Sequence, residues 1–301
     1  MTRIAVLGSG TAAAQIGCEY ALGGCSVLWA YDEDGAQQRV EDALRLASGT
    51  GLAGPAELER ARSLMMRGDP TISSAERLTL VVDAQAAALE PRAAAIGQIA
   101  ERHPEALVAS TSPLPSVTAL GEAAGVGERM LATVYGDPPL LSPIVELLPA
   151  RDTPRRLVDR VSQLLRALGK RPVMIRREVP GLVGARLELA MLREALSLIQ
   201  RGVIDADALD ELVRDSLARR WALAGPIEAA TLGDTGALLE LVRAVDAEPP
   251  AAERSAEELA ALAGEAGSAR AASLRERVDE GLAAALRAER AARRRGAENG
   301  S

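Results

Sequence analysis

The residues best suited to chemistry come early in the chain, in a short turn that contains glycine. Residues 4–7 are apolar and strand-like, and Gly8-Ser9-Gly10-Thr11-Ala12-Ala13 follows them directly. An Ala-rich stretch with helical character covers 14–22, and a second apolar run covers 26–31. Strand, glycine turn, helix and strand in this order predict a unit that binds a dinucleotide.

Each residue type in the turn has a physical use. Gly8 permits a tight turn, and Gly10 lets the backbone approach a pyrophosphate closely. Ala13 is small enough for the helix to pack on the strand. Backbone N–H groups at Thr11 and Ala12 open the helix, whose N-terminus attracts phosphate. We therefore expect these five residues to contact the cofactor.

The second apolar run ends in an acidic segment. Asp32-Glu33-Asp34 follows Tyr31, and an acidic side chain here normally accepts hydrogen bonds from the adenosine ribose. Three carboxylates with no arginine among them would repel a 2′-phosphate, so the sequence favours NAD over NADP. The alternative is that these acidic residues only form the solvent-exposed N-terminus of the next helix.

Strands and helices alternate as far as residue 179, and the remaining pattern is helical throughout. The alternation predicts an α/β fold, with an N-terminal Rossmann domain that has a doubly wound, mostly parallel sheet over 1–179. An all-α C-terminal domain is expected over 180–301. Its expected helical stretches are 182–200, 205–218, 235–246, 255–265 and 268–294, and the Arg-rich last one is expected to be solvated.

Composition narrows the function classes. A net charge of −7 argues against nucleic acid as a partner, because such binding depends on basic patches. Cys18 and Cys25 show no metal-ligand spacing and indicate a reducing, cytoplasmic setting. The opening apolar run has the length of an ordinary strand, so we expect neither a signal peptide nor a membrane span.

The order of segments resembles the 3-hydroxyacyl-CoA dehydrogenase family over about residues 1–245. Four stretches carry this resemblance: the Gly8 turn, Ser-Thr-Ser-Pro-Leu-Pro at 110–115, Ala-Leu-Gly-Lys-Arg-Pro-Val at 167–173 followed by Pro-Gly-Leu-Val at 180–183, and Gly-Pro-Ile-Glu at 225–228. The resemblance implies NAD-linked oxidation of a 3-hydroxyacyl thioester. It also implies a helical C-terminal domain that forms a homodimer.

The resemblance also implies site residues, and several differ from the family pattern. The family's base is a His held by a Glu; these positions fall on Val134 and Glu146, so the carboxylate is present and the imidazole is not. The family Asn that helps polarise the substrate carbonyl falls on Ala185. Ser112 matches the Ser that contacts substrate.

On the cofactor side, the family's acidic ribose position falls on Tyr31, with Asp32 one residue later. The family Lys of the next segment corresponds to Arg92, and its nearby Glu falls on Ala87.

Two other residues could supply the missing proton. Tyr135 is adjacent to the Val134 position, although neighbouring residues of a regular strand point to opposite faces. Asp137 is the other candidate, and its alternative interpretation is a turn residue before Pro138. His103 precedes Pro104 at the end of an expected helix, so we expect it on the surface.

Three functions remain open. The first is a diverged oxidoreductase that acts on an acyl thioester, carried by coenzyme A or a carrier protein, or on a polyketide-like carbonyl compound. The second is a catalytically silent protein that binds a dinucleotide or thioester. The third is a non-redox enzyme, such as a cyclase or dehydratase, that reuses the site through Asp137 and Glu146.

Overall fold

The computed structural model describes residues 2–30, 35–69, 77–112, 114–232, 235–246 and 271–298. The chain divides into two compact units. The first comprises Met1–Gly184 together with Ser273–Ser301, and the second comprises Ala185–Ala272. Among the described residues, we find no helix with the length and apolar character needed to cross a membrane.

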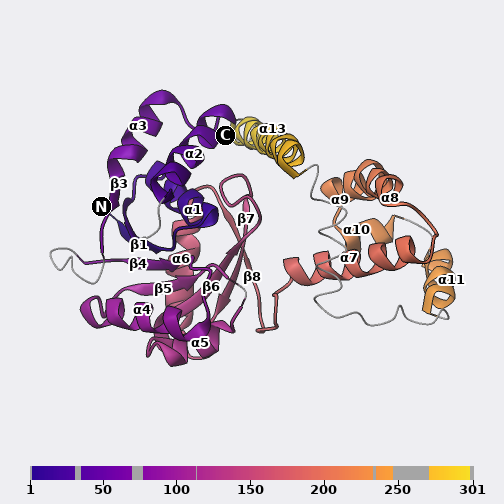
Figure 1. The fold of residues 1–301 in the computed structure, drawn as a ribbon. Helices are drawn as coiled ribbons and strands as arrows, with labels where there is room; N and C mark the ends of the chain where they lie inside the picture. The colour runs from indigo at the N-terminus through magenta and orange to yellow at the C-terminus, as the bar shows by residue number, and fades with distance from the viewer. Residues whose placement is uncertain are drawn as a thin grey trace. The chain divides into compact units, whose positions relative to one another are not determined.

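The first unit is built on an eight-stranded sheet (Figure 1). Its strands are β1 (Arg3–Leu7), β2 (Ser26–Ala30), β3 (Met65–Arg67), β4 (Leu80–Asp83), β5 (Leu107–Ser110), β6 (Met130–Tyr135), β7 (Ile144–Pro149) and β8 (Arg171–Met174). The order is β3-β2-β1-β4-β5-β6-β7-β8. Neighbours are parallel except for β6 and β7, which are antiparallel. The predicted doubly wound, mostly parallel sheet is confirmed.

Helices cover both faces of this sheet (Figure 1). The helices before β8 are α1 (Thr11–Leu22), α2 (Ala36–Gly49), α3 (Pro55–Leu64), α4 (Leu89–Arg102), α5 (Val117–Ala123), the 3₁₀ turn η1 (Gly127–Arg129) and α6 (Arg155–Ala167). One buried cluster joins the sheet to α1, α2 and α6. A second joins it to α4 and α5. Strands buried on both faces read as continuous apolar runs in the sequence, as these do.

The strand order determines where a ligand can bind. The chain leaves β1 toward β2 and β3, then returns to place β4 on the other side of β1. The carboxyl ends of β1, β4, β5 and β6 consequently meet at one edge of the sheet. Open α/β sheets bind ligands at this edge, next to the point where the order reverses.

The second unit is helical. Its described elements are α7 (Gly184–Gln200), α8 (Ala206–Leu212), the π-helical turn η2 (Val213–Leu217), α9 (Ala218–Leu223), α10 (Pro226–Thr231) and α11 (Thr235–Asp246). Many of its apolar side chains are exposed in the single chain, among them Leu187, Val203, Leu223, Ile227 and Leu232. The expected all-α domain is confirmed as a fold.

The last helix, α13 (Ala271–Glu298), differs from expectation. From Ser273 it groups with the first unit rather than with the helical one. Ala283 and Leu286 are buried, and the Arg287 guanidinium donates to the Thr50 carbonyl. Most of its described residues are exposed, as expected for a solvated helix, but Ala283 and Leu286 are covered by the first unit.

One other expectation also needs correction. His103 was expected on the surface and is instead buried. Its Nδ1 accepts a hydrogen bond from the Leu78 N–H at 3.5 Å, and its carbonyl accepts one from Arg129 at 3.0 Å.

Candidate functional site

The glycine turn lies at the carboxyl end of β1. Gly8 has a φ of +121°, and a Cβ at this residue would lie 2.5 Å from the carbonyl oxygen of Ala84. Any side chain here would have to displace backbone atoms that follow β4. The Gly8 carbonyl accepts a hydrogen bond from the Trp29 indole N–H at 2.8 Å, and its N–H donates to Ala30 at 3.2 Å. The turn is thus held by hydrogen bonds from β2 and packs against the backbone that follows β4.

The next part of the turn is open. A Cβ at Gly10 would meet nothing within 4 Å, although Gly10 is the N-cap residue of α1. The first turn of α1, which includes Thr11, carries no acidic residue, and no described side chain caps it. A helix N-terminus with a positive end and no carboxylate favours an anion. The backbone here fits the pyrophosphate of a dinucleotide.

The adenosine side of the turn is described only in part. The Arg39 guanidinium on α2 donates to the Ser9 carbonyl at 2.9 Å, which places a cation beside the glycine turn. Tyr31 and Asp32, the predicted ribose-binding residues, lie outside the described residues.

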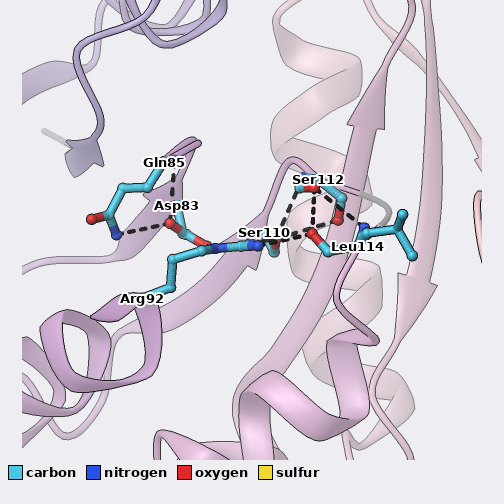
Figure 2. A network of polar contacts seen from close by, with 6 residues as sticks. All are labelled: Asp83, Gln85, Arg92, Ser110, Ser112 and Leu114. Atoms are coloured by element: carbon cyan, nitrogen blue, oxygen red, sulfur yellow. Dashed lines mark hydrogen bonds and ion pairs between the residues drawn. The ribbon is translucent and has the colours of Figure 1, made fainter. Parts of the chain in front are cut away.

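A buried ion pair lies beneath the next two strand ends (Figure 2). Asp83 ends β4 and Arg92 lies on α4, with exposed fractions of 0% and 1%. Arg92 Nε and Nη2 donate to the same Asp83 oxygen at 2.9 and 2.7 Å. Nη2 also donates to the Ser110 hydroxyl at 2.6 Å, and Nη1 donates to the Leu114 carbonyl at 2.9 Å. One guanidinium therefore joins the ends of β4 and β5 to the loop after β5.

Ser112 lies in that loop and is half-buried. Its hydroxyl donates to the Leu114 carbonyl at 2.5 Å and accepts from the Leu114 N–H at 3.2 Å. Its own N–H donates to the Ser110 hydroxyl at 3.4 Å. These contacts form a tight turn that sets the direction of the Ser112 hydroxyl (Figure 2).

Val134 and Glu146 are direct partners in the antiparallel β6–β7 ladder. Directly opposed side chains in such a ladder lie on one face, with Cβ atoms about 5 Å apart. The Glu146 carboxylate accepts hydrogen bonds from the N–H groups of Val183 at 2.8 Å and Gly184 at 3.1 Å. Glu146 thus caps the start of α7, which begins at Gly184.

Tyr135 points to the other face of the sheet. It packs with the α1 cluster, whereas Val134 packs with the α4 cluster. Its hydroxyl lies 3.4 Å from that of Tyr20, and Lys170 Nζ lies 5.9 Å from its ring centre. Burial raises the pKa of Tyr135 well above its usual value, and the nearby Tyr20 and Glu19 raise it further. The structure does not bring Tyr135 together with Glu146.

Asp137 is exposed on the loop after β6 and forms an ion pair with Arg275 of α13 at 2.9 Å. Among the described residues, no group of three His, Cys, Asp or Glu side chains could hold a metal ion.

Comparison with known proteins agrees with this arrangement. Residues 3–179 match the NAD-binding domain of 3-hydroxyacyl-CoA dehydrogenase, and residues 181–276 match its C-terminal domain. The chain belongs to the 3-hydroxyacyl-CoA dehydrogenase family. Its sheet-containing unit includes the family's NAD-binding domain, and the glycine turn lies within the matched segment.

Individual relatives are similar over shorter stretches. A 3-hydroxyacyl-CoA dehydrogenase of Gibberella moniliformis is 38% identical over 130 residues, covering 43% of this chain and 40% of that protein. A 5-formyl-3-hydroxy-2-methylpyridine 4-carboxylate 5-dehydrogenase of Mesorhizobium japonicum is 36% identical over 124 residues, covering 41% and 40%. The alignments therefore span less than half the length of these two relatives.

A solved structure resembles more of the chain. The crystal structure of a 5-formyl-3-hydroxy-2-methylpyridine 4-carboxylic acid 5-dehydrogenase, titled an NAD+-dependent dismutase, has a TM-score of 0.82. It covers 95% of this chain and 98% of its own at 22% identity, which shows a shared fold.

Within this 3-hydroxyacyl-CoA dehydrogenase fold, sequence reasoning missed three contributors. Asp83 and Ser110 accept hydrogen bonds from Arg92. Both are the last residues of their strands, and a polar residue at the end of an apolar run could have indicated that they lie at the ligand-binding edge of the sheet. Arg39 shows no such signal, because it lies on the polar side of an ordinary amphipathic helix. The roles predicted for Ser112, Glu146 and Arg92 stay predictions.

Proposed function

We propose that this member of the family is an NAD-dependent oxidoreductase that interconverts the 3-hydroxy and 3-oxo forms of a small acyl thioester, carried by coenzyme A or a carrier protein. The observation that carries this proposal is the shared edge of the sheet. The open helix N-terminus at Gly10 and the Ser112 turn lie at the carboxyl ends of strands in one unit. Both named relatives in the comparison are dehydrogenases.

On this proposal, each polar group has a defined task. Bound NAD supplies the hydride acceptor or, when reduced, the donor. Backbone N–H groups at the start of α1, beginning with Thr11, bind the pyrophosphate. The Ser112 hydroxyl, whose direction is set by Leu114, orients the substrate oxygen. Positioning of this kind supplies a large part of enzymatic acceleration.

The acid–base part of the site is where this chain departs from the family. We propose that Val134 and Ala185 occupy the family's His and Asn positions. The pairing of Val134 with Glu146 supports the first correspondence, because a His at 134 would face that carboxylate. Valine carries no proton, so we assign proton exchange to water beside Glu146. Tyr135 and Asp137, with partners in Tyr20 and Arg275, receive no proton-transfer role.

We also propose that two copies form a homodimer through the helical unit. Leu223, Ile227 and Leu232 are 92%, 81% and 74% exposed in the single chain. Apolar exposure on this scale is typical of a surface that a partner covers. A cytoplasmic location is part of the proposal, supported by the free thiols of Cys18 and Cys25.

The test is reduction of acetoacetyl-CoA and of a carrier-protein-linked acetoacetyl thioester by the purified chain, with NADH or NADPH as the donor. We expect slow turnover with NADH that falls about tenfold or more in Ser112→Ala, because one orienting hydrogen bond is lost. Equal rates in the wild type and Ser112→Ala would contradict the assignment of Ser112. NADH binding without reduction of any thioester would favour a silent binding protein.

A further inference from the structure

The buried Arg92 guanidinium lies between the glycine turn and the Ser112 turn of the proposed site. Its burial favours a structural role over direct contact with the cofactor. It donates to the Asp83 carboxylate, the Ser110 hydroxyl and the Leu114 carbonyl (Figure 2). With an exposed fraction of 1%, it acts from inside the protein.

Toward the cofactor, the network reaches the glycine turn. The second oxygen of Asp83 accepts hydrogen bonds from the Gln85 side chain at 3.0 Å and the Gln85 N–H at 3.4 Å. This folds the backbone after β4 into a fixed turn. Ala84, inside that turn, presents the carbonyl that limits Gly8 to glycine. Arg92 thus fixes the backbone against which the phosphate-binding turn packs.

Toward the substrate, the network reaches Ser112 by two routes. The Ser110 hydroxyl accepts from both Arg92 and the Ser112 N–H. The Leu114 carbonyl accepts from both Arg92 and the Ser112 hydroxyl. Because both partners are shared, a shift of the guanidinium would move the Ser112 hydroxyl as well.

We propose that Arg92 is a positioning residue that fixes the Ser112 turn and the backbone beneath the glycine turn relative to each other. The planar guanidinium suits this task, since its rigid fork donates in several directions at once. A lysine would keep the charge beside Asp83 and lose the fork. The catalytic consequence of this role rests on the proposed function, while the structural consequence does not.

Arg92→Lys tests the proposal, with Arg129→Lys as the matched control. Arg129 also donates to several groups in the same unit, the carbonyls of Ala100, His103 and Ala106. The first measurement is amide hydrogen exchange over residues 110–116. We expect exchange there to rise roughly tenfold in Arg92→Lys, through easier local opening, and to stay unchanged in Arg129→Lys. Equal exchange in the two variants would overturn the proposal.

The second measurement separates positioning from general destabilisation. In thioester reduction, Arg92→Lys should lower kcat by up to about tenfold and no more than Ser112→Ala does, because it acts through the position of the Ser112 hydroxyl. The dissociation constant for NADH should change less than kcat does, within about threefold, since the pyrophosphate binds to N–H groups at the start of α1, which Arg92 does not contact directly. Adding Arg92→Lys to Ser112→Ala should cost much less than adding it to the wild type. Full additivity would overturn the proposal.

A milder variant guards against misfolding. Ser110→Ala removes one of the two routes to Ser112 without leaving a charge unpaired, and it should raise loop exchange less than Arg92→Lys does. If the wild type reduces no thioester, the proposed function fails, while the exchange comparison still decides the role of Arg92.

Discussion

The cofactor end and the acid–base end of this site use their polar groups differently. At the cofactor end, Gly8 is packed against the backbone that follows β4, and the start of α1 at Gly10 is open. At the acid–base end, Val134 faces Glu146 across a regular ladder, and the carboxylate is engaged by the backbone at the start of α7. The cofactor end thus leaves its backbone groups available for a ligand, whereas the carboxylate at the acid–base end serves as a helix cap.

This difference shows that positioning and proton transfer can change independently. Orienting reactants supplies up to about 7–11 kcal/mol of a barrier. A general acid or base contributes about 10²–10⁴-fold in rate. A chain that still orients its reactants but has lost its general acid or base would remain a slow, specific enzyme. The following predictions examine each end separately, starting with the largest effect.

Val134→His should give the largest change. The new imidazole would face Glu146 across the ladder, which orients it and stabilises its charged form. We expect kcat for thioester reduction to rise about 10²-fold, with a new pH dependence above the usual imidazole pKa of about 6.5, because the facing carboxylate favours the charged form. Val134→Gln, polar but unable to titrate in this range, is the control. Equal rates in both variants would show that a titratable group at position 134 takes no part in proton transfer.

Gly10→Ala should weaken NADH binding with little effect on the fold. Its Cβ meets no protein atom within 4 Å, so the unfolding temperature should fall only slightly, because alanine is a poorer N-cap than glycine. The methyl group would hold the pyrophosphate away from the backbone, and losing one charge-assisted hydrogen bond lowers affinity about tenfold or more. Gly49→Ala, also open and at the end of α2, is the control. Unchanged NADH affinity in Gly10→Ala would show that the pyrophosphate does not bind at this turn.

Glu146→Gln separates a helix cap from a proton carrier. Losing the charge from the start of α7 should lower the free energy of unfolding by about 1 kcal/mol. In the wild-type background kcat should change less than about threefold, because water exchanges the proton. In the Val134→His background the same change should cost much more. A large loss of kcat in the wild-type background would make Glu146 catalytic itself.

The two facing phenols predict a smaller, pH-dependent effect. Burial raises the pKa of Tyr20 above its usual value of 10.0, so the neutral form is favoured in the fold. Above about pH 10 the unfolded chain ionises first, and the free energy of unfolding falls by about 1.4 kcal/mol per pH unit for each such group. Below that pH the effect disappears. Urea unfolding at pH 9 and 11 should show a smaller loss in the free energy of unfolding for Tyr20→Phe than for the wild type. Equal losses would contradict a raised pKa of Tyr20 in the fold.

Much of the fold could be predicted because its signals are local. Apolar strand runs and the glycine turn near Gly8 are read from adjacent residues, and alternation with helices then indicates a parallel sheet. The order β3-β2-β1-β4 follows from general rules for such sheets. The position of α13 could not be predicted, because it depends on a few buried residues such as Leu286 and on distant partners.

For the candidate site, the sequence names residues and roles that stay predictions, and it does not show their contacts. Ser112 and Glu146 were named from the family pattern, but neither the Leu114 turn nor the cap at Gly184 could be read from the sequence. The cap joins Glu146 to a residue 38 positions away, and the Leu114 turn depends on the exact backbone conformation of its loop. The same limit explains His103, whose burial depends on the Leu78 N–H from another segment.

The most direct measurement is an NADH titration followed by tryptophan fluorescence in Trp221→Phe. This variant leaves Trp29 as its single tryptophan, and the Trp29 indole N–H is bonded to the Gly8 carbonyl within the glycine turn. We predict saturable quenching by NADH that Gly10→Ala weakens. If neither NADH nor NADPH changes the signal or releases heat in calorimetry at millimolar concentration, the chain does not use its glycine turn for a dinucleotide, and the proposed oxidoreductase is wrong.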